Sequence, residues 1–292
     1  MGKELKDQVF TEERALFGSR GVALEGCVFD KGESPFKHAS DITARECLFR
    51  YKYPFWYCDG VSLEKVTFFE MARAGIWYTK HFQMKDTIVE APKNFRRCED
   101  VVLENVLLSN AQETLWSCND VTLRNVRAMG DYFAMNSSNL KISGLDLVGN
   151  YSFDGVTDLE ISDSNLVTKD AFWNSDRVTV RNCFITGEYL GWNSKNLTLI
   201  DCTIESLQGM CYIENLVMKN CRLINTTLAF EYSDVDADIT GGIESVFNPA
   251  SGQIRAERIG HLVIQKDCID PGKTKILCNE IEETTDTPEG LW

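Results

Sequence analysis

A short apolar pattern returns every 19 to 21 residues through most of this chain of 292 residues. It is clearest at residues 120–129, DVTLRNVRAM, and it returns at residues 100–109, 177–186, 196–205 and 215–224. A fixed period near 20 residues indicates a repeat architecture, which limits the fold more than any other feature of the sequence. With Asn125 as the reference position, the equivalent residues are Gly26, Glu46, Lys65, Asp86, Asn105, Asn125, Gly144, Asp163, Asn182, Asp201 and Asn220.

Three positions in each of these eleven repeats are apolar: four before, two before and three after the reference. The residues between them are mostly polar, such as Arg124 and Lys219. This alternation is typical of a strand with one buried face. The reference position itself favours Asn, Asp and Gly, which tolerate the left-handed backbone of a sharp bend.

Each repeat therefore holds two or three short strands and has no room for a crossover helix. We predict an all-β fold, a single-stranded right-handed parallel β-helix with about 19–21 residues per coil. Inward side chains of successive coils would form ladders about 4.8 Å apart. A leucine-rich repeat has an overlapping period, but its helical half does not match half-repeats rich in aromatic, Asn and Ser residues.

We expect one β-helix domain over residues 1–292. Residues 1–20 would form an N-terminal cap that protects the open end. Residues 21–235 hold the regular coils, residues 236–278 form shorter coils or a C-terminal cap, and residues 279–292 form an acidic tail. The repeat does not specify an oligomeric state.

The formal net charge of −14 argues against nucleic-acid binding, which needs a basic surface. No apolar run has the length of a membrane span, and residues 1–10 lack the apolar core of a signal peptide, so we predict a cytoplasmic protein. There are eleven cysteines without a CxxC pair, and we expect no metal or cofactor. Five cysteines directly follow the reference position and should be buried ladder residues: Cys27, Cys47, Cys183, Cys202 and Cys221.

Candidate catalytic residues lie six or seven positions after the reference, where each coil should turn. Asp170 and Glu188 fall on neighbouring coils, so their carboxyl groups would lie roughly 5–7 Å apart, close to the separation in retaining glycosidases. One would act as an acid with a raised pKa and the other as nucleophile or base. Asp131 belongs to the same line, and Asp154 is a further candidate because its register otherwise holds large apolar residues.

Substrate-binding candidates accompany these carboxylates: Tyr132, Tyr151, Lys169, Tyr189 and Trp192. The tyrosines and the tryptophan would offer faces on which sugars stack. The alternative is structural, with solvated corner residues, a Lys169–Glu188 ion pair, and Asp154 shaping a turn with Gly155.

The earlier coils are more basic. Residues 43–100 hold ten Lys or Arg and eight Asp or Glu, about +2 in an acidic protein. Arg73, Lys93 and Arg96 are expected to grip a carboxylated or phosphorylated ligand, unless they pair with neighbours such as Glu113.

Five segments make the chain resemble a bacterial family of unknown function that is placed with the pectate-lyase-like right-handed β-helices: YPFW (53–56), AGIWY (74–78), APKNFRR (91–97), YSFDG (151–155) and GEYLGWNS (187–194). The resemblance implies the fold. The wider superfold is associated with acidic-polysaccharide lyases and glycoside hydrolases. The Asp pair and Gly-His-Gly pattern of polygalacturonases has no match here, and His38, His81 and His261 are isolated.

Two functional hypotheses remain open. The first is a carbohydrate-binding or carbohydrate-active β-helix, similar to a glycoside hydrolase or polysaccharide lyase, whose partner is an oligosaccharide or another small anionic ligand. The alternative is a non-catalytic scaffold that binds a protein along its flank. The residues leave open whether the protein is an enzyme.

Overall fold

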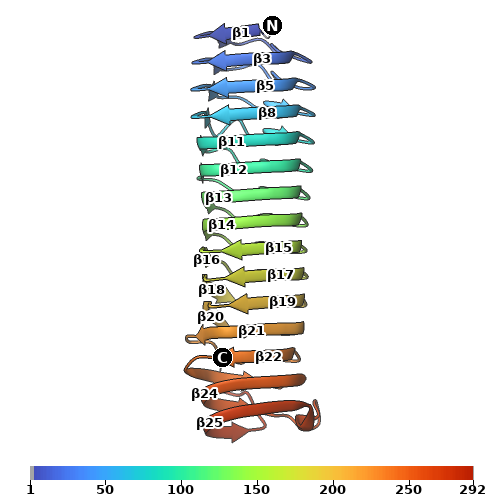
Figure 1. Ribbon diagram of the computed structural model, residues 1–292, viewed down its shortest axis with the longest axis vertical. Coiled ribbons are helices and arrows are strands. Elements are labelled where there is room, and N and C mark those ends of the chain that lie inside the picture. The colour runs from blue at the N-terminus through green and yellow to red at the C-terminus, as the bar shows by residue number, and fades with distance from the viewer. Residues whose placement is uncertain (1–2, 292) are drawn as a thin grey trace. The chain divides into compact units, whose positions relative to one another are not determined.

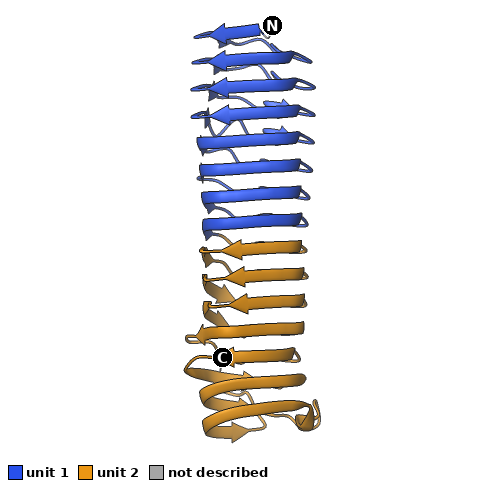
Figure 2. Cartoon of the chain, in the orientation of Figure 1, with its two compact units in different colours: residues 1–148 blue, residues 149–292 orange. Residues whose placement is uncertain are grey.

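The computed structural model describes residues 3–291 and divides into two compact units, residues 1–148 and residues 149–292 (Figure 2). Each unit is built from parallel strands stacked coil on coil (Figure 1), and the predicted parallel β-helix is confirmed. Residues 1, 2 and 292, which belong to the predicted cap and tail, lie outside the described residues. None of the helices in the described residues has the length and apolar character needed to cross a membrane.

The first unit contains the strands of the earlier repeats. Strand β3 pairs in parallel with β5, and β12 pairs in parallel with both β11 and β13. The strands are β1 (Lys3–Lys6), β2 (Val9–Phe10), β3 (Arg20–Glu25), β4 (Val28–Phe29), β5 (Ser40–Arg45), β6 (Leu48–Phe49), β7 (Phe55–Trp56), β8 (Asp59–Glu64), β9 (Thr67–Phe68), β10 (Ile76–Trp77), β11 (Lys80–Val89), β12 (Glu99–Leu108), β13 (Asn119–Met129) and β14 (Ser138–Val148).

The second unit continues the same pattern and ends with two long strands and one short 3₁₀ helix, η1. Its elements are β15 (Thr157–Ser162), β16 (Asn165–Val167), β17 (Asp176–Arg181), β18 (Phe184–Glu188), β19 (Lys195–Ile200), β20 (Thr203–Leu207), β21 (Glu214–Leu223), β22 (Asp234–Ile239), β23 (Gly242–Phe247), β24 (Ser251–Val263), η1 (Pro271–Lys273) and β25 (Thr274–Thr285).

Side-chain ladders fill the interior of both units. All 33 positions predicted to be apolar and inward are buried. Leu103 pairs with Leu123 and Leu123 with Ile142, so equivalent residues of successive coils lie next to one another. Phe49 stacks between Phe29 and Phe68, with ring centroids 5.2 and 4.8 Å away. Stacked apolar side chains of this kind supply the main stabilisation of a solenoid, since each coil buries its inward face only against its neighbours.

The reference position is a left-handed bend in every repeat. All eleven residues have a φ between 49° and 65°, including Glu46 and Lys65, which have no special preference for this conformation. Backbone hydrogen bonds hold the bend, for example from the Asn182 N–H to the Ile200 carbonyl at 3.0 Å. The five cysteines beside these bends are buried as predicted, and all eleven cysteines are free thiols.

The ends of the chain differ in detail from the predicted segments. Strands β1 and β2 pair with β3 and β4, so residues 3–10 already belong to a coil. Strand β24 has 13 residues, which makes it longer than the strands of the regular coils. Residues 279–285 belong to β25, whereas a tail was predicted from Asn279. Acidic composition indicates exposure, but it does not exclude the backbone pairing that β25 makes with β24.

Candidate functional site

The predicted line of corner residues exists in the second unit. Tyr151, Asp170 and Tyr189 occupy equivalent left-handed positions, with φ values of 56°, 56° and 53°. The N–H of Tyr151 donates to the Lys169 carbonyl at 2.9 Å, and that of Asp170 donates to the Glu188 carbonyl at 2.8 Å. These bonds align one corner over the next, and they bring Lys169, Asp170, Glu188 and Tyr189 to the same edge of the unit. We call Tyr151, Lys169, Asp170, Glu188, Tyr189 and Trp192 the corner strip.

Asp170 and Glu188 have different environments within this strip. Asp170 is only 8% exposed. Its burial and the negative charge of Glu188 raise the pKa of the Asp170 carboxyl, and Lys169 partly opposes them. The Lys169 ammonium lies 2.7 Å from Glu188 Oε1. Asp170 and Glu188 therefore lie near each other. The Lys169–Glu188 ion pair, which belongs to the structural interpretation of these residues, is also present.

Aromatic side chains lie next to these carboxylates. The Trp192 ring contacts Trp173 at 6.1 Å and Tyr189 at 5.9 Å between centroids. The Trp173 indole N–H donates to the Tyr189 carbonyl at 2.9 Å, which fixes this corner on the preceding coil. The Tyr189 side chain is 37% exposed and presents part of its ring to solvent. The strip therefore combines hydrogen-bonding groups with partly open aromatic faces.

Three further residues from the next two coils extend the strip, and they were not identified from the sequence. Glu231 is buried, and it accepts hydrogen bonds from Gln208 Nε2 at 2.6 Å and from the Tyr212 hydroxyl at 3.4 Å. Burial and the neighbouring Glu231 carboxylate raise the pKa of Tyr212. The Tyr212 ring also contacts Trp192, with centroids 4.6 Å apart. Gln208 lies seven residues after the reference Asp201, the register of Asp170 after Asp163, so extending the predicted corner line to this repeat would have found it.

Asp154 lies in a turn of the same unit. It accepts a hydrogen bond from Asn174 Nδ2 at 2.9 Å, and Asn174 Oδ1 accepts one from Asn193 Nδ2 at 2.8 Å. Gly155 follows in the left-handed conformation, with a φ of 66°. These hydrogen bonds place Asp154 in a ladder of amide side chains along the turns. This agrees with the structural interpretation, in which Asp154 shapes a turn with Gly155.

Asp131 and Tyr132 form the corresponding corner of the first unit. The Asp131 carbonyl accepts a hydrogen bond from the N–H of Glu113 at 2.9 Å, and the Tyr132 carbonyl accepts one from the Trp116 indole N–H at 2.6 Å. Tyr132 has a φ of 58°, like the corner residues of the second unit. The same backbone construction therefore occurs in both units, and Tyr132 presents the same residue type as Tyr151 and Tyr189 of the second unit.

The predicted basic residues of the first unit have separate roles. Arg96 lies between the rings of Trp77 and Trp116, with its guanidinium carbon 4.8 and 4.5 Å from their centroids. Arg96 Nη2 lies 3.0 Å from Glu113 Oε2, and Lys93 Nζ lies 2.9 Å from Glu113 Oε1. Arg73 is exposed on the loop between β9 and β10. Two of the three predicted ligand cations are thus paired with Glu113.

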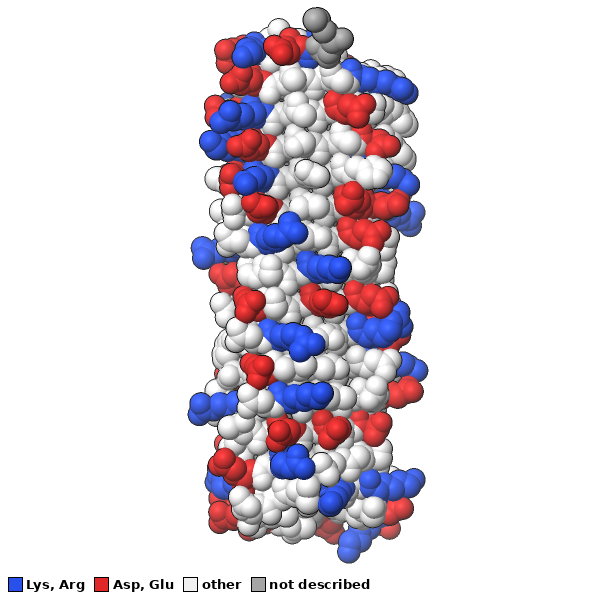
Figure 3. All heavy atoms as spheres, in the orientation of Figure 1, with Lys and Arg blue, Asp and Glu red and all other residues white. Residues whose placement is uncertain are grey.

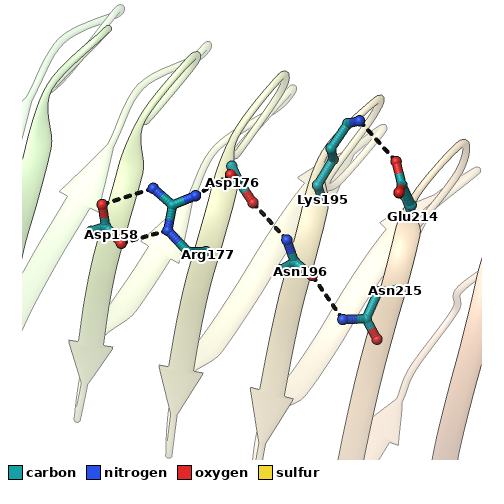
Figure 4. Close-up of polar contacts among 7 residues, drawn as sticks. All are labelled: Asp158, Asp176, Arg177, Lys195, Asn196, Glu214 and Asn215. Atoms are coloured by element: carbon teal, nitrogen blue, oxygen red, sulfur yellow. Dashed lines mark hydrogen bonds and ion pairs between the residues drawn. The ribbon is translucent and has the colours of Figure 1, made fainter.

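A second set of polar side chains lines the start of strands β15, β17, β19 and β21 (Figure 4). Arg177 forms a two-pronged contact with Asp158, at 2.7 and 2.9 Å, and also contacts Asp176. Asn196 Nδ2 donates to Asp176 Oδ1 at 2.7 Å. The hydrogen bond from Arg177 lowers the pKa of the exposed Asp158 carboxyl. These groups satisfy one another across neighbouring coils, so we assign them to coil alignment.

Charges of both signs are interspersed on the face drawn in Figure 3, in each of the two units. Many are paired between neighbouring coils, such as Lys85 with Glu104 at 2.8 Å and Lys195 with Glu214 at 2.8 Å. Within residues 3–291, no group of three or more His, Cys, Asp or Glu side chains is arranged to hold a metal ion.

The fold and its corners define a parallel β-solenoid protein with a polar and aromatic flank. The family model described as "Protein of unknown function (DUF3737)" matches residues 3–277, and the chain belongs to this family. No curated protein is significantly similar to it in sequence.

Solved structures with a related arrangement have low sequence identity. PfbA, a surface adhesin of Streptococcus pneumoniae, is 9% identical over 87% of this chain and 86% of that chain, with a TM-score of 0.49. The A-module of the mannuronan C-5 epimerase AlgE4 of Azotobacter vinelandii is 12% identical over 97% of this chain and 87% of that chain, with a TM-score of 0.28. The AlgE6 A-module from the same organism is 13% identical over 98% and 89%, with a TM-score of 0.32. At these values the likenesses carry no argument about function.

Proposed function

We propose that this protein binds carbohydrate and that the corner strip of its second unit is the binding surface. The observation that carries the proposal is the direct juxtaposition of Asp170, Lys169 and Glu188 with the partly exposed ring of Tyr189. Sugars are recognised by this combination, since their hydroxyl groups need polar partners and their C–H faces stack on aromatic rings. Coils repeat about every 4.8 Å, close to the length of one pyranose unit, so a glycan running along the strip would meet successive coils in step.

The ion pair between Glu188 and Lys169 favours binding over hydrolysis. A retaining mechanism needs one protonated and one ionised, available carboxylate. The raised pKa of Asp170 suits the first role. Lys169 already contacts Glu188 at 2.7 Å, so a nucleophilic Glu188 would first have to leave its cation. We therefore place hydrolysis by Asp170 and Glu188 second to binding.

A non-catalytic scaffold that binds a protein along its flank is the alternative. The same Lys169–Glu188 ion pair favours it. The polar groups at the start of β15, β17 and β19, which bond to one another, favour it as well. A surface whose charges are already paired needs no small ligand to neutralise it. The two functions differ in ligand class, which makes them separable by experiment.

The decisive experiment is a screen of neutral and acidic oligosaccharides by thermal shift and by glycan array. Binding to a confirmed ligand should weaken at least tenfold, about 1.4 kcal/mol, in Tyr189→Ala. The matched control is Tyr57→Ala, which removes a similarly exposed tyrosine from the first unit. Release of reducing ends, measured with Asp170→Asn and Glu188→Gln, tests hydrolysis on the same ligand. Absence of any ligand among both glycan classes would refute glycan binding, and equal affinity of the Tyr189 variant and the wild type would refute the corner strip as the binding surface.

A further inference from the structure

The last strand of the second unit has an open edge. β25 pairs in parallel with β24 along one side, from Thr274 to Thr285. Within residues 3–291 no strand pairs with its other side. The backbone N–H and C=O groups of a free edge are a template for another strand.

Apolar side chains accompany this free edge. On β24, the inward residues Ile254, Ala256 and Ile259 are buried, because the last strand covers them. Their partners on β25 are Ile276, Cys278 and Ile281, and Ile281 remains 39% exposed. These three residues continue the ladder of the interior, but no further coil of the described chain covers them. Adding one more strand in register would bury them as β25 buries their partners.

The opposite end of the chain does not offer a comparable surface. Strands β1 and β2 at that end have only four and two residues; the inward residue Leu5 is 6% exposed, whereas Val9 of β2 is 65% exposed. Such short edge strands are poor templates for pairing. The segment after β25 places Leu291 against the cluster of Leu228, Phe247 and Val263, while Ile281 stays open.

The charge pattern of β25 identifies its partner. Lys275 lies in its first half and Lys273 directly precedes it, whereas Glu280, Glu282 and Glu283 lie in its second half. When identical edges are related by a two-fold axis, they run antiparallel, so the first half of one strand faces the second half of the other. The lysines of each copy would therefore face the glutamates of its partner, a favourable cross-strand arrangement. These contacts would add to those that Glu282 and Glu283 make with Arg258 and His261 of their own β24.

We propose that the free edge of β25 is the interface of a symmetric homodimer, in which β25 pairs antiparallel with β25 of a second copy. The interface combines backbone hydrogen bonds, burial of Ile276, Cys278 and Ile281, and two sets of lysine–glutamate contacts. It is independent of the proposed glycan surface. A dimer without glycan binding and glycan binding by a monomer are therefore both interpretable results.

The experiment measures mass by light scattering and sedimentation over a range of protein concentrations. The wild type should approach twice 33.1 kDa, about 66 kDa. Two charge-reversed variants, Lys273→Glu with Lys275→Glu and Glu282→Lys with Glu283→Lys, should each raise the dimer dissociation constant at least tenfold. Mixing these two variants should restore a dimer, because the residues reversed in one variant then face residues of opposite charge reversed in the other. The control Lys195→Glu reverses an exposed cation elsewhere in the unit and should leave the mass unchanged.

Three outcomes would overturn the proposal: a wild type that stays monomeric, charge-reversed variants that dimerise as the wild type does, or a mixture of the variants that stays monomeric. Circular dichroism verifies the fold of each variant. If a variant has lost its fold, hydrogen–deuterium exchange on the wild type decides. The amides of β25 should then be protected at high concentration and exchange after dilution, and exchange that does not depend on concentration excludes this interface.

Discussion

Replacing Arg96 by glutamine should destabilise the first unit because Arg96 joins two aromatic rings and one carboxylate. Its guanidinium carbon lies 4.8 Å from the Trp77 centroid and 4.5 Å from the Trp116 centroid. A cation–π contact contributes about 0.5–1 kcal/mol at a partly exposed site. The ion pair with Glu113 adds up to about 1 kcal/mol. We therefore expect Arg96→Gln to lower the free energy of unfolding by about 2 kcal/mol.

Urea denaturation followed by far-UV circular dichroism measures this loss. With an m-value of about 3 kcal/mol/M, the midpoint should fall by about 0.7 M. The matched control is Lys93→Gln, which breaks the other ion pair with Glu113 but touches neither ring. Lys93 is the more exposed of the two cations, so its loss should cost less than about 1 kcal/mol.

The comparison of the two variants tests the reasoning. If Arg96→Gln costs no more than Lys93→Gln, the aromatic sandwich does not stabilise the unit. Arg96 would then be available to a ligand, as the sequence suggested. A double-mutant cycle between Arg96→Gln and Trp77→Leu isolates the stacking contribution, which should appear as a favourable coupling.

Three further predictions concern titration and thiol chemistry. Asp170→Asn should stabilise the protein at pH 7 and not at pH 3. Because the pKa of Asp170 is raised in the folded protein, its carboxyl contributes fully to the free energy of unfolding below the ordinary Asp pKa, and this contribution is lost as the pH rises through the raised value. Urea midpoints at both pH values measure the difference. The hydrogen bond and charge of Asp59 raise the pKa of His81, so NMR titration should show a lower His81 pKa in Asp59→Asn. Native thiol labelling should modify exposed Cys268 first and leave the nine buried cysteines unmodified.

The coils were predictable because the same physical pattern is repeated many times. An inward apolar residue at one position proves little, but eleven repeats with the same three apolar positions leave few other folds. The bends followed for the same reason. Glu46 and Lys65 would not indicate a left-handed bend alone, yet their register matches Asn105 and Asn125, and all four have the same conformation.

The contacts of the corner residues were less predictable. Register placed Arg96 among basic residues, but it did not show that two tryptophans enclose the guanidinium, because that depends on side-chain rotamers. Register also placed Asp154 beside large side chains, whereas its carboxylate bonds to Asn174 in a turn. Register did not place Glu231 in the corner strip because the repeat is irregular there, and only the structure shows Gln208 and Tyr212 contacting it.

The corners are where this solenoid can change its chemistry at least cost. Asp170 has the same backbone conformation as Tyr151 and Tyr189 although its side chain differs, because backbone hydrogen bonds to the next coil hold each of them. An inward residue such as Phe49 contacts aromatic rings on both neighbouring coils, so a substitution there disturbs three coils. A corner substitution mainly changes what the flank presents to solvent. Tyr189→Ala should therefore affect ligand binding with little effect on the fold, and a large loss of thermal stability in this variant would contradict this division between ladder and corner.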